Sequence, residues 1–261
     1  MAILQAQGLK KIYGSGDNAV HALDGVDLRV EKGEFVAIVG TSGSGKSTLM
    51  YLLDRLYPLS PENGRIEIGG VDIADISSDW LRRNIGMVLQ EPFLFSRTLE
   101  ENIAIASGQE PEDGKDGEHS RLARVRSAAR IARLDETITH FAKGYDTFVG
   151  ERGVTLSGGQ KQRTAIAQML IRKPPVMVFD DSLSAVDAET DAEIRRALRE
   201  NVGSATVILI AHRLTTLMHA DQILVMDQGR LVQRGTHEEL LAQDGIYRQI
   251  YDLQVRQSGS R

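Results

Sequence analysis

Residues 40–48 read GTSGSGKST, a glycine-rich segment that ends in a lysine, a serine and a threonine. The spacing matches G-x-x-x-x-G-K-[ST], in which backbone N–H groups of the turn wrap the phosphates of a nucleotide. Side chains on the turn would block that approach, which explains the glycines. The lysine reaches the β- and γ-phosphates, and the serine hydroxyl is a ligand for Mg²⁺. We therefore expect nucleotide-binding residues at Gly40, Ser42, Gly43, Gly45, Lys46, Ser47 and Thr48.

Two further segments have residue types suited to the same chemistry. Residues 176–181, VMVFDD, are an apolar run ending in carboxylates, and this suits a Mg²⁺ held by Asp180 directly or through water. Residues 156–160, LSGGQ, precede a helical stretch. A serine and two glycines that open a helix form a second anion-binding end, although one nucleotide does not need two phosphate cradles in one chain.

The elements expected around these residues alternate between strand and helix. Residues 34–40 form a short apolar run typical of a strand buried on both faces, and residues 47–56 have helical spacing. Alternation of strands and helices predicts a mostly parallel, wrapped sheet. The later strands are expected at 176–180, 206–210 and 222–226, and the helices between them at 188–201 and 214–219. Alternating patterns at 8–13 and 20–30, with short runs at 64–68 and 85–89, predict further strands.

The middle of the chain, residues 98–169, is mainly helical in pattern and is expected to be an inserted subdomain. Residues 107–120 are polar, charged and rich in glycine, so we expect a mobile surface loop. Residues 121–133 place Leu122, Val125, Ala129 and Ala132 on one helical face. The arginines of that helix fit a solvated face better than an anion site.

Composition limits the classes of protein that remain. The chain has 261 residues, no cysteine and a formal net charge of −5, so thiolate chemistry is excluded and a basic nucleic-acid surface is not expected. No apolar stretch approaches the roughly 20 residues that a bilayer-spanning helix needs. The N-terminus lacks the pattern of a signal peptide. We therefore expect a soluble, cytoplasmic protein that relies on a partner if it works at a membrane.

The order and spacing of these motifs resemble the nucleotide-binding domains of ATP-binding-cassette (ABC) transporters over residues 9–254. The resemblance implies a P-loop NTPase (RecA-like) α/β core with an N-terminal antiparallel β subdomain at 1–90 and 170–236. It also implies an α-helical subdomain at 91–169 and a C-terminal helical segment at 237–261. The ligands it implies are ATP and Mg²⁺.

The resemblance assigns roles to further residues of this sequence. Tyr13 would stack on adenine, Gln90 would contact Mg²⁺ and the membrane partner, and His212 would contact the γ-phosphate. Residues 184–187, SAVD, would cross a dimer interface. The implied catalytic residues are Asp181, His212 and Gln90, the metal ligands are Ser47, Gln90 and Asp180, and Ser157, Gly158, Gly159 and Gln160 would meet a nucleotide.

Most of the chain is similar to exporter-type domains, including residues 149–153, VGERG, which resemble a loop that touches intracellular helices of the membrane domains. The implied partners are a second nucleotide-binding domain, as a homodimer or heterodimer, and the transmembrane domains of an exporter, with no nucleic acid. The implied location is peripheral to the inner or plasma membrane. The N-terminal fifth instead resembles the stand-alone ATPases of lipoprotein- and macrolide-releasing transporters. A naturally mixed subfamily and a chimera both explain this.

Position 181 departs from the family, which normally has glutamate after the Mg²⁺ aspartate. Asp181 draws the carboxylate back by about 1.5 Å, and a misplacement of ~1 Å can cost on the order of 100-fold in rate. Two functions follow: an ATPase that powers an exporter through head-to-tail dimerisation, and an ATP-gated dimerisation module with a nearly inactive site. An aspartate working through a shifted water is a third possibility. A soluble ABC ATPase acting on DNA, translation or cluster assembly is disfavoured by the acidic charge and by residues 149–153.

Overall fold

The computed structural model describes residues 2–107, 114–150, 155–181, 186–201, 203, 205–211 and 213–258. They form two compact units, the first from Met1–Ile85, Val176–Asp180 and Ser204–Arg261 and the second from Gly86–Pro175 and Asp181–Gly203. The resemblance implied that residues 86–90, 170–175 and 181–203 belong to the core. In the structure all three ranges belong to the second unit, and the helix within 181–203 packs on another helix of that unit.

One sheet of the first unit is antiparallel, with the strand order β2-β1-β4-β5. Its strands are β1 (Ala2–Tyr13), β2 (Val20–Glu31), β4 (Arg65–Ile68) and β5 (Val71–Asp72). Strand β1 starts six residues before the expected Gly8, because Leu4 and Ala6 are buried and pair with Ile68 and Ile66 of β4. Burial of alternate apolar residues therefore extends the strand toward the N-terminus.

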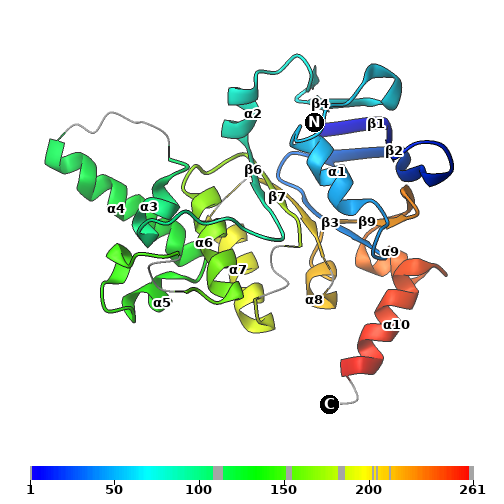
Figure 1. The fold of residues 1–261 in the computed structure, drawn as a ribbon. Helices are drawn as coiled ribbons and strands as arrows, with labels where there is room; N and C mark the ends of the chain where they lie inside the picture. The colour runs from blue at the N-terminus through cyan, green and yellow to red at the C-terminus, as the bar shows by residue number, and fades with distance from the viewer. Residues whose placement is uncertain are drawn as a thin grey trace. The chain divides into compact units, whose positions relative to one another are not determined.

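The strands of the second sheet that lie wholly within the first unit have the order β10-β9-β3-β8-β7. Figure 1 labels β9, β3 and β7 of this sheet. Within the first unit its strands are β3 (Phe35–Gly40), β7 (Val176–Phe179), β8 (Thr206–Ile210), β9 (Gln222–Asp227) and β10 (Arg230–Gly235). Strand β3 lies in the middle, parallel to β8 and β9, and all six of its residues are buried. Parallel strands that are buried on both faces have continuous apolar sequences, and this is why the sequence predicted them. Their carboxyl ends share one edge, where ligands of such sheets bind.

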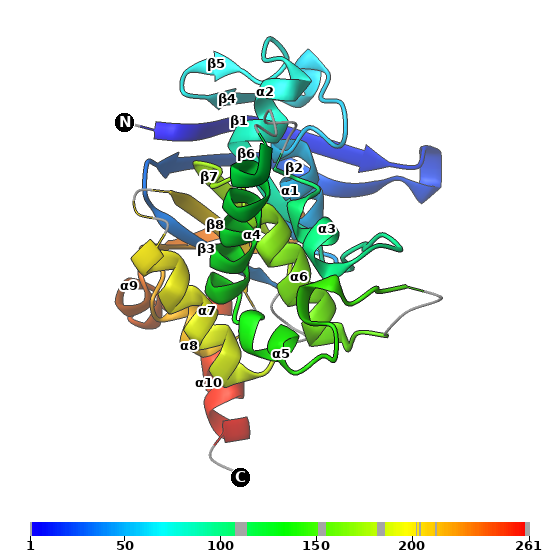
Figure 2. The same cartoon turned by 90° about the vertical axis from the view of Figure 1, so that its left-hand side faces the viewer.

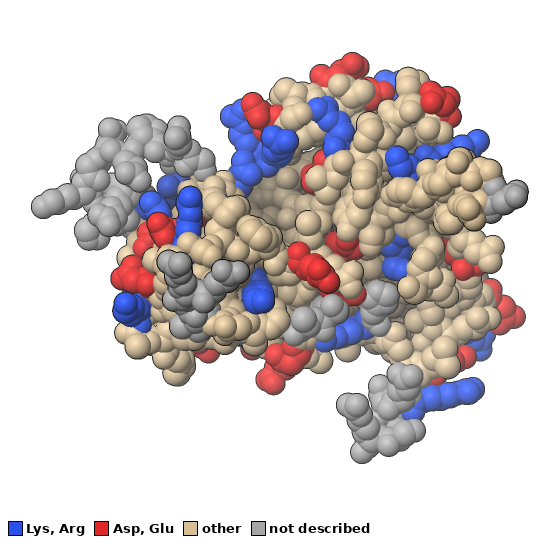
Figure 3. Space-filling view, in the orientation of Figure 1, with Lys and Arg blue, Asp and Glu red and all other residues tan. Residues whose placement is uncertain are grey.

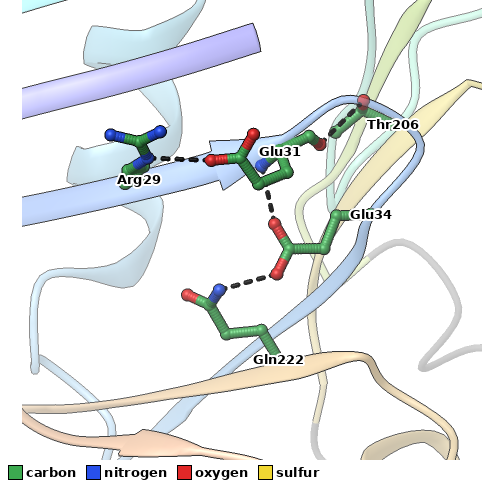
Figure 4. Close-up of polar contacts among 5 residues, drawn as sticks. All are labelled: Arg29, Glu31, Glu34, Thr206 and Gln222. Carbon is green, nitrogen blue, oxygen red and sulfur yellow. Dashed lines mark hydrogen bonds and ion pairs between the residues drawn. The ribbon is translucent and has the colours of Figure 1, made fainter. Parts of the chain in front are cut away.

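The amino ends of three of these strands are tied together by polar side chains (Figure 4). Glu34, which precedes β3, accepts hydrogen bonds from the Glu31 backbone N–H at 2.7 Å and from Gln222 Nε2 at 2.7 Å. Thr206 Oγ1, at the start of β8, donates to the Glu31 carbonyl at 3.4 Å. Arg29 Nε pairs with Glu31 Oε1 at 2.8 Å. These bonds fix the register at one end of β3, so its other end delivers residues 40–48 at a defined place.

The first unit is completed by short helices and by the C-terminal segment. They are α1 (Lys46–Leu53), α2 (Ser78–Asn84), α8 (Leu214–Leu217), α9 (His237–Leu241), α10 (Ile246–Ser258) and the 3₁₀ turns η1 (Gly16–Asn18) and η2 (Pro61–Asn63). The buried His237 Nδ1 and the Tyr247 hydroxyl, 2.6 Å apart, join α9 to α10.

On the face in Figure 3, basic and acidic side chains of the described residues are interspersed.

The second unit is helical (Figure 2). Strand β6 (Ile85–Val88) starts at the unit boundary, and the helices are α3 (Leu99–Ala104), α4 (Gly114–Ile131), α5 (Asp135–Thr139), α6 (Gly158–Leu170) and α7 (Ala188–Asn201), with the turn η3 (Gly144–Asp146). Helices α3, α4 and α6 contact one another, and α7 contacts α4. The prediction of a loop at 107–120 is wrong for its second half, because α4 already begins at Gly114. Extending a formed helix adds one hydrogen bond for each residue fixed, even where the segment is polar.

No helix among the described ranges is long and apolar enough to cross a bilayer.

Candidate functional site

The turn at residues 40–48, called here the phosphate loop, needs its glycines for two different reasons. A Cβ on Gly40 would lie 2.1 Å from the Met226 carbonyl oxygen, and one on Gly45 would lie 2.1 Å from the Ala22 carbonyl oxygen. These two glycines let the loop pack directly on backbone of β9 and β2. Gly43 has φ +77° and open space within 4 Å of its Cβ position. The loop is therefore anchored at both ends and open at Gly43, where a phosphate would approach.

Lys46 is the first residue of α1, and its side chain is turned into the phosphate loop. It is buried, and its Nζ donates to the carbonyl oxygens of Gly40 at 2.9 Å and Thr41 at 2.8 Å and to Ser44 Oγ at 3.2 Å. The ammonium group is thereby held inside the turn. A fixed positive charge surrounded by backbone is what a polyphosphate requires.

Ser47 and Asp180 are brought together although 133 residues separate them. Ser47 Oγ donates to Asp180 Oδ1 at 2.9 Å, from the start of α1 to the residue after β7. Asp180 is 1% exposed, and its Oδ2 is buried with no hydrogen-bond partner among the described residues. A hydroxyl and a carboxylate with a spare oxygen are hard ligands of the kind that Mg²⁺ takes together with substrate phosphates. The residues present therefore fit Mg²⁺.

Tyr51 was missed by the sequence reasoning. Burial, together with the negative charge of Asp180, raises the pKa of Tyr51 to about 12. Its ring packs edge-to-face on Tyr57 at 5.7 Å, and Tyr57 packs in the same way on Tyr13 at 6.2 Å. An aromatic row thus leads from Tyr13, the expected adenine contact, to the neighbourhood of Asp180. The sequence spacing could have indicated Tyr51 as a site residue, because it follows Ser47 by four residues and therefore lies on the same helix face.

In the second unit, residues 156–160 place a capped helix end at the surface. Ser157 Oγ accepts from the Gln160 backbone N–H at 3.3 Å, and the Ser157 N–H donates to Gln160 Oε1 at 2.9 Å. This reciprocal pair is a capping box at the start of α6. Ser157 and Gly158 are exposed while Leu156 is buried, so the apolar residue anchors the turn. The Ser157 hydroxyl accepts in the cap and keeps its hydrogen available to donate.

The remaining expected site residues also belong to the second unit where they are described. Gln90 is exposed, and its carbonyl accepts from Gln162 Nε2 at 3.0 Å. Asp181 has φ +46°, in the left-handed region. Asp187 caps α7 by accepting from the Thr190 N–H at 2.9 Å, and this hydrogen bond lowers the pKa of Asp187. His212, residues 151–154 and residues 182–185 lie outside the described residues.

Comparison with known proteins decides the family. Residues 23–184 match the family model described as ABC transporter. This chain belongs to the ABC transporter family. The P-loop NTPase fold expected from the sequence is confirmed, and so is the resemblance to ATP-binding domains of ABC exporters.

Three similar proteins show the extent of the likeness. The uncharacterized ABC transporter ATP-binding protein YfiB of Bacillus subtilis (strain 168) is 45% identical over 239 residues, 92% of this chain and 39% of that protein. The toxin RTX-I translocation ATP-binding protein of Actinobacillus pleuropneumoniae is 43% identical over 233 residues, 89% of this chain and 31% of that protein. The structure of a bacterial Atm1-family ABC exporter with ATP bound has a TM-score of 0.84 and 40% identity, covering 96% of this chain and 41% of that one. The chain spans well under half the length of these relatives.

Proposed function

We propose that this ABC domain binds and hydrolyses MgATP and thereby powers an exporter. The observation that carries the proposal is the Ser47–Asp180 hydrogen bond at 2.9 Å, which leaves the buried Asp180 Oδ2 without a partner beside the phosphate loop. The similarity to a toxin translocation ATP-binding protein and to an ABC exporter, each over about nine-tenths of the chain or more, supports the transport role.

Each residue of the site has a separate task in this proposal. Lys46 supplies a fixed charge to the β- and γ-phosphates, and the open side of Gly43 admits them. Ser47 and Asp180, with Gln90, would hold Mg²⁺, which when bound neutralises phosphate charge. Asp181 would polarise the attacking water. His212 would contact the γ-phosphate, and Tyr13 would stack on adenine.

Two copies would dimerise head to tail around two nucleotides. Residues 156–160 of one copy would meet the γ-phosphate bound by the other, through the Ser157 hydroxyl and the N–H groups of Gly158 and Gly159. Exposure of this capped helix end supports the role, since an incoming phosphate finds donors already ordered. The partner would be a second copy or a homologous domain.

The membrane partner would dock on the second unit, which would place the domain at the cytoplasmic face of the membrane. Phe93 is 73% exposed, Phe95 is 42% exposed, and their rings lie 5.1 Å apart edge to face. Phe148 is 43% exposed and precedes residues 149–153. Exposed aromatic side chains of this kind favour burial against another protein surface.

Asp181 supports a second candidate, an ATP-gated dimerisation module that hydrolyses slowly. Its side chain is shorter than glutamate, and its φ of +46° is a conformation that aspartate tolerates better than most residues. The same protein would then bind ATP and dimerise with little turnover. Steady-state phosphate release at saturating MgATP separates the two candidates.

Titration calorimetry with MgATP tests the assignment of the phosphate loop. Lys46→Ala should weaken binding on the order of 10- to 100-fold, because charge-assisted hydrogen bonds to the phosphates are lost. The matched control is Lys32→Ala, an exposed lysine next to the amino end of β3, which should bind as the parent does. Equal affinity of the parent and Lys46→Ala would overturn the assignment.

A further inference from the structure

Gln162 is a buried amide that no part of the proposed chemistry uses. It lies on α6 and is 2% exposed. Its Nε2 donates to the carbonyl oxygen of Gln90 at 3.0 Å, a bond that spans 72 residues of sequence. Its Oε1 is buried and has no hydrogen-bond partner among the described residues. Burial of an unsatisfied amide oxygen is unfavourable, so an apolar residue would fit this place better if packing were its only role.

The segment that Gln162 holds begins directly after β6, whose last residue, Val88, is buried. Beyond β6, residues 89–93 are exposed or half-buried, and Phe93 is 73% exposed. The far end of the segment is fixed by a second glutamine of α6, since Gln168 Nε2 donates to the Asn102 carbonyl at 2.9 Å. The Asn102 side chain in turn binds backbone of the preceding loop, including the Phe95 N–H at 2.9 Å. Gln162 is thus a direct tie between α6 and the backbone of Gln90.

Helix α6 begins with the capping box of Ser157, five residues before Gln162. The two residues lie on the same rigid helix, so a shift of the helix end moves the amide that holds Gln90. Because the Gln90 backbone sets where its side chain reaches, displacement at Ser157 is passed to the residue expected at Mg²⁺.

We propose that Gln162 is a positioning residue that sets the Gln90 backbone and couples it to the Ser157 end of α6. The proposal rests on the role proposed above for Gln90. In this proposal, the contact that Ser157 makes at the start of α6 and the contact that Gln90 makes with the metal move together.

Two measurements on matched variants test this. Gln162→Met keeps the side-chain length and removes the donor and the unsatisfied oxygen; Gln168→Met makes the same change at the far end of the segment. In nucleotide-free protein, amide hydrogen exchange of residues 89–95 should quicken on the order of 10-fold in Gln162→Met and stay within about 2-fold of the parent in Gln168→Met. The Mg²⁺ concentration for half-maximal ATP hydrolysis should rise about 10-fold in Gln162→Met alone.

A Gln90→Ala variant separates failure of this inference from failure of the proposed function. If Gln90→Ala raises the Mg²⁺ requirement and Gln162→Met does not, the positioning role is overturned while the role of Gln90 stands. If neither variant changes the requirement, Gln90 is not at the metal and both proposals fall. Equal changes in Gln162→Met and Gln168→Met would mean general loosening and would also overturn the inference. Gln162→Leu replaces the Met variant if that protein does not fold.

Discussion

Ser157 allows helix stability to be separated from nucleotide recognition, because its hydroxyl oxygen serves the first and its hydrogen would serve the second. Ser157→Ala removes the acceptor for the Gln160 N–H, a bond of 3.3 Å. Loss of an N-cap costs about 1 kcal/mol, which lowers the Tm of a chain of this size by roughly 2–4 °C. Ser157→Asp keeps an equally good cap, and the new carboxylate suits the helix N-terminus, so its Tm should match the parent.

The two variants should rank in the opposite order for ATP-dependent dimerisation. A hydrogen bond to a charged group contributes about 1.5–3 kcal/mol, and a homodimer would contain two such sites. Ser157→Ala should therefore weaken the dimer by about 3–6 kcal/mol, on the order of 10²–10⁴-fold in Kd. Ser157→Asp should weaken it at least as much, because its carboxylate repels the γ-phosphate.

Sedimentation velocity in ATP and in ADP measures dimerisation, and an Asp181→Asn background keeps ATP intact during the run. The control is Thr98→Ala, which removes the capping box of α3, where Thr98 Oγ1 accepts from the Glu101 N–H at 3.1 Å. It should lose a similar amount of stability and still dimerise in ATP. A Ser157→Asp protein that dimerises in ATP as the parent does would refute the reasoning.

Three other outcomes are expected. Asp181→Glu should raise the rate of phosphate release on the order of 10- to 100-fold, and strain of glutamate at a φ of +46° would reduce that gain. If the rate does not increase in a protein that still dimerises, position 181 does not limit hydrolysis. In urea unfolding, Gly43→Ala should lower the free energy of unfolding by about 1–2 kcal/mol, and this variant should bind MgATP poorly. Gly45→Ala should lower the free energy of unfolding by more, because its Cβ would meet the Ala22 carbonyl oxygen. Equal losses of stability would contradict the packing argument. Burial raises the pKa of Asp54 to about 6 from 3.8, so its protonated form is favoured in the fold and stability falls as pH rises from 4 through 6, by at most about 3 kcal/mol. Asp54→Asn should therefore raise Tm at pH 7, leave it unchanged at pH 4 and flatten the profile between; an unchanged profile would exclude the shift.

The sequence by itself determined the features that depend on neighbouring residues. The phosphate loop was readable because its glycines, lysine and serine are contiguous and follow an apolar run, and β3 was readable because a doubly buried strand has no polar face. The opening of α6 was readable from a serine and two glycines, since caps are local interactions. These features were enough to identify the fold and the family.

Only the tertiary structure decided which distant residues meet. The bond from Ser47 to Asp180 depends on the start of α1 meeting the end of β7, and nothing near either residue in the sequence encodes that distance. The partner of Gln162 and the unpartnered state of its Oε1 depend on how α6 packs, because a glutamine has the same pattern whether it is buried or solvated. Helix α4 begins inside a segment expected to be a loop, because its later part is held by packing of Val125, Ala128 and Ala129, and a formed helix gains one hydrogen bond for each residue added. Turns and helix caps depend on residues that are close in sequence, so the sequence alone predicts them. Strand order, side-chain burial and long-range hydrogen bonds depend on the packing of the whole unit.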